Sequence, residues 1–275
     1  MQLIIIFDFS TKPILTNMPA TLNPTIILLL FLVLNSWTQL FAQEMEPIQT
    51  DRPDLTESAF TVPVGYFQLE SGLLRVHNNS YTQLSLHPTL LFKYGLTKTL
   101  ELRLNTDFAT YQNNGVSEFL ILPIAVGVKI AISKEKGIIP KTAFIGHLKI
   151  PTGGESELAS TYFAPSFRFT MQHSLSKKIS LGYNLGTEWS GVTAEPIFIY
   201  TVTSAISITT TLGAYIELFG YAPQFNQAEH SIDGGFTCLI NKNCRADLSV
   251  GYGITSNAPD YFLSAGLSFR INTRN

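Results

Sequence analysis

The chain has 275 residues, of which 45% are hydrophobic and only 14% charged, and its formal net charge is −2. A soluble domain usually has about 25% charged residues, and this near-neutral balance leaves no basic surface for a nucleic-acid partner. Past residue 43 no apolar run reaches the about 20 residues that a membrane helix needs. Apolar residues are instead interleaved with polar ones, as in a β-barrel whose outer face meets lipid.

The N-terminal region has the pattern of an export signal. Its apolar core, Ile26–Leu34, has the length of a signal-peptide core and is too short to span a bilayer. We expect a signal peptide over residues 1–42, with residues 1–17 as an upstream extension if translation starts at Met18. The alternative is a single membrane anchor over residues 22–42.

Residues 43–63 are acidic, and prolines remove any strand or helix period. Four charged residues crowd together in this stretch: Asp51, Arg52, Asp54 and Glu57. Because such clusters are usually solvated, we expect a periplasmic leader here. The alternative is a plug segment tucked into a barrel mouth, where Arg52 pairs with carboxylates of the lumen.

Residues 64–275 show repeated period-2 alternation, which is typical of β-strands. Between residues 245 and 254, for example, apolar side chains alternate with polar or very small ones. The predicted strands are 64–76, 80–94, 98–110, 117–132, 138–150, 160–174, 178–190, 194–206, 209–220, 228–240, 244–255 and 260–271. The pattern predicts an all-β, antiparallel transmembrane β-barrel of about 12 strands.

The connections between predicted strands differ with parity. Those after even strands are short and most contain Lys, whereas those after odd strands contain none and include the longest, 151–159 and 221–227. Bacterial outer-membrane barrels have short periplasmic turns, longer outer loops and an even number of strands. A soluble sandwich predicts no such alternation, so we expect the bacterial outer membrane as the location, with both termini in the periplasm.

The inward faces of the predicted strands carry charges of both signs, which favours a narrow lumen braced by ion pairs. We expect Glu217 and Asp233 to face each other on neighbouring strands, with Arg245 or Arg270 as a partner. The lumen-lining candidates are Gln68, Glu70, Glu101, Arg103, Asn105, Asp107, His147, Lys149, Arg168, Glu188, Glu217, Asp233, Arg245, Asp247 and Arg270.

Other residue types suggest little chemistry. Aromatic residues near strand ends, among them Trp189, Phe219 and Tyr221, are expected to form interfacial girdles. Cys238 and Cys244 flank a tight turn and are expected either to form a small periplasmic disulfide or to remain two free thiols. The five His residues lack metal-ligand spacing and no nucleophile stands out. We therefore expect no cofactor, no metal site and no enzymatic activity.

Several stretches together resemble the outer-membrane family named for the meta-pathway of phenol degradation. They are Thr50-Asp51-Arg52-Pro53-Asp54-x-Thr56-Glu57-Ser58, Val64-Gly65-Tyr66-Phe67-Gln68-Leu69-Glu70-Ser71-Gly72, Lys149-Ile150-Pro151-Thr152-Gly153, Asp233-Gly234-Gly235-Phe236 and Asp247-Leu248-Ser249-Val250-Gly251-Tyr252-Gly253. The resemblance covers roughly residues 48–271. It implies an outer-membrane barrel that moves small, often aromatic or hydrophobic, compounds, and it brings no catalytic residues.

These observations lead to one functional hypothesis and two alternatives. The hypothesis is passive diffusion of small hydrophobic or aromatic molecules through a narrow lumen, with membrane lipid and these solutes as the partners. One alternative is a structural or surface-interaction barrel with a closed lumen. The other is a lipase-type hydrolase embedded in the barrel.

Overall fold

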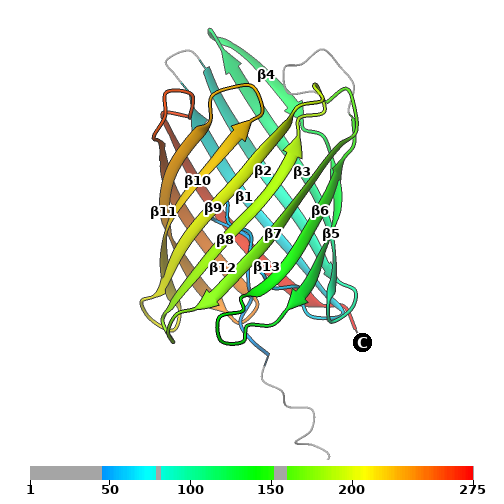
Figure 1. Ribbon diagram of the computed structural model, residues 1–275, viewed down its shortest axis with the longest axis vertical. Coiled ribbons are helices and arrows are strands. Elements are labelled where there is room, and N and C mark those ends of the chain that lie inside the picture. The colour runs from blue at the N-terminus through cyan, green and yellow to red at the C-terminus, as the bar shows by residue number, and fades with distance from the viewer. Residues whose placement is uncertain (1–44, 79–81, 152–159, 275) are drawn as a thin grey trace, which may run out of the picture. The chain divides into compact units, whose positions relative to one another are not determined.

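A closed antiparallel β-barrel is built by residues 64–274 of the computed structural model, which describes residues 45–78, 82–151 and 160–274 (Figure 1). Within these ranges no helix is long and apolar enough to cross a bilayer. The predicted signal peptide, residues 1–42, lies outside the described residues.

Thirteen strand segments form the sheet, and each one is antiparallel to its neighbours. They are β1 (Tyr66–His77), β2 (Thr82–Gly95), β3 (Leu100–Asn113), β4 (Val116–Ile121), β5 (Ala125–Ser133), β6 (Lys141–Lys149), β7 (Ala164–Ser174), β8 (Ile179–Trp189), β9 (Pro196–Ser207), β10 (Leu212–Pro223), β11 (Glu229–Asn241), β12 (Cys244–Gly253) and β13 (Tyr261–Asn272). Pairing of β1 with β13 joins the first and last strands, and this pairing closes the barrel.

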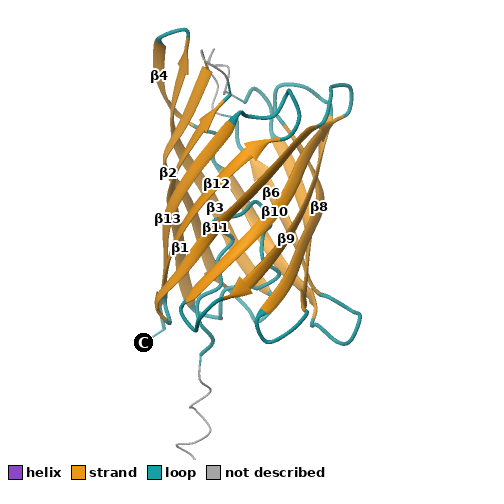
Figure 2. Cartoon of the chain, turned by 90° about the vertical axis from the view of Figure 1, so that its left-hand side faces the viewer, coloured by secondary structure: helices purple, strands orange, loops and turns teal. Residues whose placement is uncertain are grey.

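The barrel has twelve strand positions because β4 and β5 share one of them. Both pair with β3, β4 along its second half and β5 along its first half. The expected continuous strand 117–132 is therefore wrong in one respect, since it breaks at residues 122–124. Pro123 lies in this break and has no N–H group to donate to a ladder. The β3–β4 hairpin rises beyond the neighbouring strands at the end opposite the C-terminus (Figure 2).

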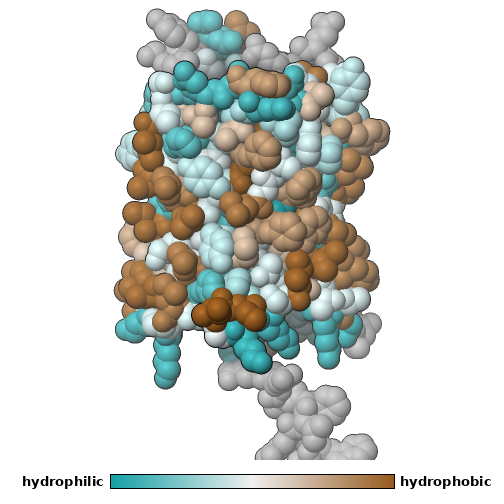
Figure 3. Space-filling view, in the orientation of Figure 1, coloured by the Kyte–Doolittle hydropathy of each residue, from teal (hydrophilic) through white to brown (hydrophobic). Residues whose placement is uncertain are grey.

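Polarity is inverted relative to a soluble protein. On β12, Leu248 and Tyr252 are 59% and 57% exposed on the outer face, while Asp247 and Ser249 are buried on the inner face. Apolar side chains gather over the wall and hydrophilic ones gather toward the two ends (Figure 3). The alternation in the sequence thus separates a lipid-facing surface from a polar lumen.

Cys238 and Cys244 are free thiols in this structure. The ladder between β11 and β12 places Cys238 opposite Ala246 and Cys244 opposite Asn241. The two cysteines are therefore not cross-strand partners in this register, and of the two alternatives the structure has the unpaired one.

Residues 46–63, which we call the lumenal segment, run inside the barrel before β1 begins. The expected solvated leader is wrong for these residues. Ile48, Ala59 and Val62 are at most 4% exposed, and Asp51 is 6% exposed. The segment is fastened near the C-terminal end of the barrel, where the Ile48 amide donates to the Lys242 carbonyl over 2.9 Å.

Candidate functional site

The Asp51 carboxylate is the centre of the contacts between the lumenal segment and the barrel wall. It lies 2.8 Å from Lys93 Nζ, 2.9 Å from Arg103 Nη1 and 2.9 Å from Lys129 Nζ, cations supplied by β2, β3 and β5. Burial alone raises the pKa of Asp51, but the three cations outweigh burial and hold this pKa well below its usual value. Asp51 is therefore ionised at neutral pH and ties the lumenal segment to this wall.

The same cations have further carboxylate partners. Arg103 pairs with Glu57 over 2.7 Å and with Glu101 over 3.2 Å, and Lys93 contacts Glu70. Burial raises the pKa of Glu57, but the charges of Arg103, Lys129 and Arg168 together outweigh burial and lower this pKa overall. A buried network in which three cations pair with four carboxylates fits the expected ion-paired lumen.

Sequence reasoning missed Lys93 and Lys129, although both had a readable signal. Each lies within a strand of otherwise largely apolar residues. In a barrel wall such a lysine is costly on the lipid face and must point inward. Both side chains are at most 2% exposed in the structure.

Arg52 ties the lumenal segment to the wall made by β1, β12 and β13. Its guanidinium donates to Asp247 over 2.9 Å and to Ser264 over 2.7 Å. The guanidinium lies against Gly72 and Gly266, which are opposite each other in the β1–β13 ladder. A Cβ atom at either glycine would come within 2.3 Å of it, so only glycine permits this approach.

Glu217 of β10 holds the middle of the lumenal segment. Its two carboxylate oxygens accept hydrogen bonds from the Leu55 and Thr56 amides, both over 2.7 Å. Glu217 is opposite Asp233 in the ladder between β10 and β11, as the sequence predicted. The carboxylate of Asp233 accepts a hydrogen bond from the Tyr215 hydroxyl over 2.8 Å.

The expected pairing of these two carboxylates with Arg245 or Arg270 is wrong. Arg245 reaches Thr50 Oγ1 over 3.5 Å. Arg270 donates to Asn243 Oδ1 over 2.9 Å and to the Glu46 carbonyl. Backbone amides of the lumenal segment donate hydrogen bonds to Glu217 instead. The alternation of side chains along the strands identifies only inward side chains of the wall, so it could not predict donors from a segment folded into the lumen.

The other predicted inward residues have separate environments. Arg168 lies 3.7 Å from Glu188. Asp107 accepts a hydrogen bond from the Leu90 amide over 3.0 Å, and His147 Nε2 lies 3.2 Å from Arg103 Nε. Gln68 donates to the Gln49 carbonyl, Asn105 is an inward residue of β3, and Lys149 is half-buried at the end of β6.

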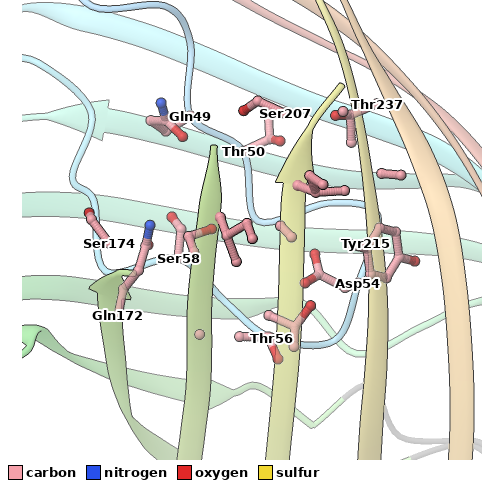
Figure 4. Close-up of a pocket in the computed structure, with 18 of the residues that line it drawn as sticks. Gln49, Thr50, Asp54, Thr56, Ser58, Gln172, Ser174, Ser207, Tyr215 and Thr237 are labelled. Atoms are coloured by element: carbon pink, nitrogen blue, oxygen red, sulfur yellow. The ribbon is translucent and has the colours of Figure 1, made fainter. Parts of the chain in front are cut away.

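The lumenal segment lies between two cavities. One, of about 370 Å³, is polar and near the Lys177–Lys178 turn; Ser174, Ser207 and Thr237 are among its walls (Figure 4). The other, of about 260 Å³, lies toward the opposite end of the barrel. Arg52, Pro53 and Asp54 line both cavities, so this part of the segment separates them.

Asp54 is a half-buried carboxyl group of the lumenal segment that lies near the carboxyl group of Asp233. Burial, and then the charge of nearby Asp233, raises the pKa of Asp54 to about 8. Asp54 therefore keeps its proton to a higher pH than Asp51 does. In the described part of the chain, no group of three His, Cys, Asp or Glu side chains could hold a metal ion.

Aromatic residues face the second cavity, where none was expected. Phe219 and Tyr221 line it with Phe262, so their expected place in the interfacial girdle is wrong. The Phe219 and Phe262 ring centroids are 5.9 Å apart, and those of Phe219 and Tyr221 are 6.3 Å apart. The sequence already indicated this orientation, since Phe219 and Tyr221 lie two and four residues after inward-facing Glu217 and side chains two residues apart on a strand share one face.

Solved structures share this architecture at low sequence identity. The COG4313 outer membrane channel from Pseudomonas putida F1 has a TM-score of 0.62 and 11% identity, covering 81% of this chain and 100% of that one. A NanC porin has a TM-score of 0.53 and 10% identity, covering 74% and 100%. No curated protein matches the chain.

The closed barrel with an apolar outer face places the chain in a bacterial outer membrane, in contact with lipid. Residues 50–271 match the family described as "Putative MetA-pathway of phenol degradation". This match begins within the lumenal segment and extends through β13. The chain therefore belongs to that outer-membrane family.

Proposed function

We propose that this barrel is a passive channel for small hydrophobic or aromatic molecules, and that the lumenal segment blocks it in the state described above. The observation that carries the proposal is the position of Arg52, Pro53 and Asp54 between two cavities that lie toward opposite ends of the barrel. A solute that crosses must pass this segment. The proposal is supported by the names of two structural neighbours, one a channel and one a porin, and by the family description.

Cavity size supports a small solute. An engineered cavity of about 150 Å³ holds benzene, so about 260 Å³ accommodates one substituted aromatic ring. Leu74, Val76, Phe219 and Phe262 give this cavity an apolar wall, which favours uncharged, poorly hydrated molecules over sugars or ions.

Ion conductance tests the blocked channel. The mature chain, residues 43–275, is refolded and compared in planar bilayers with a variant that lacks residues 46–63. We expect small or rare conductance steps from the mature chain and steps several-fold larger from the deletion variant. A difference in detergent-gel mobility between unheated and heated samples shows that each sample is folded. Equal traces from two folded samples would remove the lumenal segment as the barrier.

Solute passage needs its own measurement. Vesicles with lipopolysaccharide in the outer leaflet are loaded with the barrel, and uptake of toluene is compared with uptake of glucose. Faster entry of toluene alone supports the proposal, whereas no gain for either solute favours a closed structural barrel. We propose transport without catalysis, and hydrolysis of a p-nitrophenyl ester by the purified protein would contradict this part of the proposal.

A further inference from the structure

Arg245 of β12 lines the polar cavity of about 370 Å³ and has no carboxylate partner in the described residues. Its one hydrogen bond, from Nη1 to Thr50 Oγ1, is long at 3.5 Å. The Nη2 atom makes no hydrogen bond within the described ranges, yet it is not among the enclosed polar atoms, and the side chain as a whole is partly exposed. The guanidinium of Arg245 therefore keeps one accessible donor, Nη2, inside the lumen.

The carboxylates whose charges reach Arg245 from the wall are engaged elsewhere. Asp247, two residues along β12, pairs with Arg52 over 2.9 Å. Glu70 of β1 contacts Lys93 and accepts hydrogen bonds from backbone amides of the lumenal segment. A cation that is largely removed from water and lacks a directly paired anion is costly, and an anion from solution can supply the missing partner.

The lining of this cavity also contains two acidic residues, and neither of them occupies Arg245. Glu57 pairs with Arg103 over 2.7 Å. Asp54 shares a hydrogen bond with Thr203 and has no cation partner in the part of the chain that the structure describes. An anion in the cavity therefore meets one carboxyl group that is not already paired with a cation.

Lys177 and Lys178 add positive charge to the same cavity. They form part of the turn between β7 and β8, both are exposed, and neither is paired with a carboxylate of the described chain. Ser174 and Ser207 place hydroxyl groups in the same lining (Figure 4). Cations at the entrance of a cavity raise the local concentration of anions, so the two lysines attract an anion toward Arg245.

From this geometry we propose that the polar cavity is a binding site for a small oxyanion, a carboxylate or a phosphate, with the guanidinium of Arg245 as its anchor. Nη2 donates to an oxygen atom of the anion. Neutral molecules form no such charge-assisted hydrogen bond and bind less tightly. The site is separate from the apolar cavity, so it goes beyond the proposed channel function and does not depend on it.

Fluorine NMR on the mature chain in a non-ionic detergent measures binding. Trifluoroacetate and trifluoroethanol share a CF₃ group and differ in charge, and we expect trifluoroacetate to bind at least about tenfold more tightly. Acetate and inorganic phosphate are then added as competitors at constant ionic strength. Displacement by acetate alone assigns the site to carboxylates, and displacement by phosphate alone assigns it to phosphates. Equal binding of the two probes, or displacement by neither competitor, overturns the proposal.

Substitutions at Arg245 test the anchor. Arg245→Gln removes the charge and should weaken trifluoroacetate binding about tenfold. Arg245→Lys keeps the charge but loses the planar donor group, so the expected loss is about fourfold, and this variant serves if Arg245→Gln does not fold. The matched control is Arg75→Gln, the same change at an exposed arginine 2.9 Å from Gln83, which should alter affinity by less than about twofold. Equal affinities in the folded Arg245 variants and the control overturn the assignment of Arg245.

A pair of double variants tests the lysines. Lys177→Gln with Lys178→Gln should weaken trifluoroacetate binding about threefold at low ionic strength, and this difference should disappear at high salt. The control is Lys134→Gln with Lys136→Gln, which removes two charges from another turn at the same end of the barrel, outside the cavity lining. The control should cause a smaller loss. Equal losses in the two double variants overturn the role of Lys177 and Lys178.

Discussion

Asp51→Asn should release the lumenal segment from the barrel wall. The substitution keeps the shape of the side chain but removes the negative charge that faces Lys93, Arg103 and Lys129. Lys93 retains Glu70, and Arg103 retains Glu57 and Glu101. Lys129 retains only the carbonyls of Ser58 and Phe60 and is fully buried. The variant therefore leaves one buried lysine without a directly paired carboxylate.

The cost can be estimated from this loss. Breaking a buried ion pair by removing one partner costs about 3–5 kcal/mol. At about 1.36 kcal/mol for each factor of ten, the population of the released segment should rise at least about 100-fold. The barrel wall keeps its backbone ladder, so its own folding should change little.

Thiol labelling measures the released population. Ala59 is 1% exposed and close to Asp51 in sequence, so Ala59→Cys is a small change that becomes reactive only on release. The native cysteines are first replaced by serine, and labelling with a polar maleimide is followed with and without Asp51→Asn. The control is Asp260→Asn, the same chemical change at an exposed contact 3.3 Å from His77. Labelling rates within about threefold of each other in the two variants would refute the role of Asp51.

Three further outcomes follow from the same structure. Gly266→Ala or Gly72→Ala should displace the Arg52 guanidinium and speed labelling of Ala59→Cys about tenfold or more, since overpacking costs about 1–3 kcal/mol. The control, Gly146→Ala, whose Cβ would meet nothing closer than 3.4 Å, should leave the labelling rate unchanged. Equal labelling rates in the variants and the control would show that the Arg52 seat does not require glycine. Raising the pH should weaken docking of the lumenal segment, because the pKa of Asp54 is about 8 in the docked segment against 3.8 ordinarily. The stabilisation of the docked segment by protonated Asp54 is complete below about pH 4 and is lost as the pH rises toward 8. The docking equilibrium constant should change by at most about tenfold per pH unit. Asp51 and Glu57 have lowered pKa values, so their stabilisation is lost as the pH falls, which is the opposite direction. Asp54→Asn removes the group that titrates here, so a ratio of labelling rates between Asp54→Asn and the parent that stays constant with pH would contradict this account. Leu248→Arg on the lipid face should destabilise the barrel in urea by about 2–4 kcal/mol, while Ile138→Arg in an exposed turn should cost less than about 1 kcal/mol; similar costs would contradict the assigned outer face.

Strand positions were predictable because lipid and lumen impose opposite polarity on alternate residues. Leu248 and Asp247 illustrate this rule on neighbouring positions of β12. Apart from the broken strand, each observed strand begins and ends within four residues of its predicted bounds. Pro123 itself indicated the break, but side-chain alternation continues on both sides of it and therefore suggested one continuous strand.

The lumenal segment was not predictable from its own residues. A cluster such as Asp51, Arg52 and Asp54 is solvated or buried according to what lies opposite, and the cations that pair with Asp51 are at least 42 residues away. A list of polar inward residues also missed the apolar cavity wall. Counting by twos from Glu217 would have placed Phe219 in the lumen, whereas its aromatic ring near a strand end led to the prediction that it lies at the membrane interface.

The position of Arg52 has a consequence for assembly. Its seat is formed by Gly72 of β1 and Gly266 of β13, so it lies across the seam between the first and last strands. Arg52 precedes both strands in the chain, yet its partner Asp247 is 195 residues away. Contacts over such separations form late, after the ends of the sheet have met. We therefore expect Arg52 to be seated only after β1 has paired with β13, so that a seated Arg52 marks a barrel whose seam is complete.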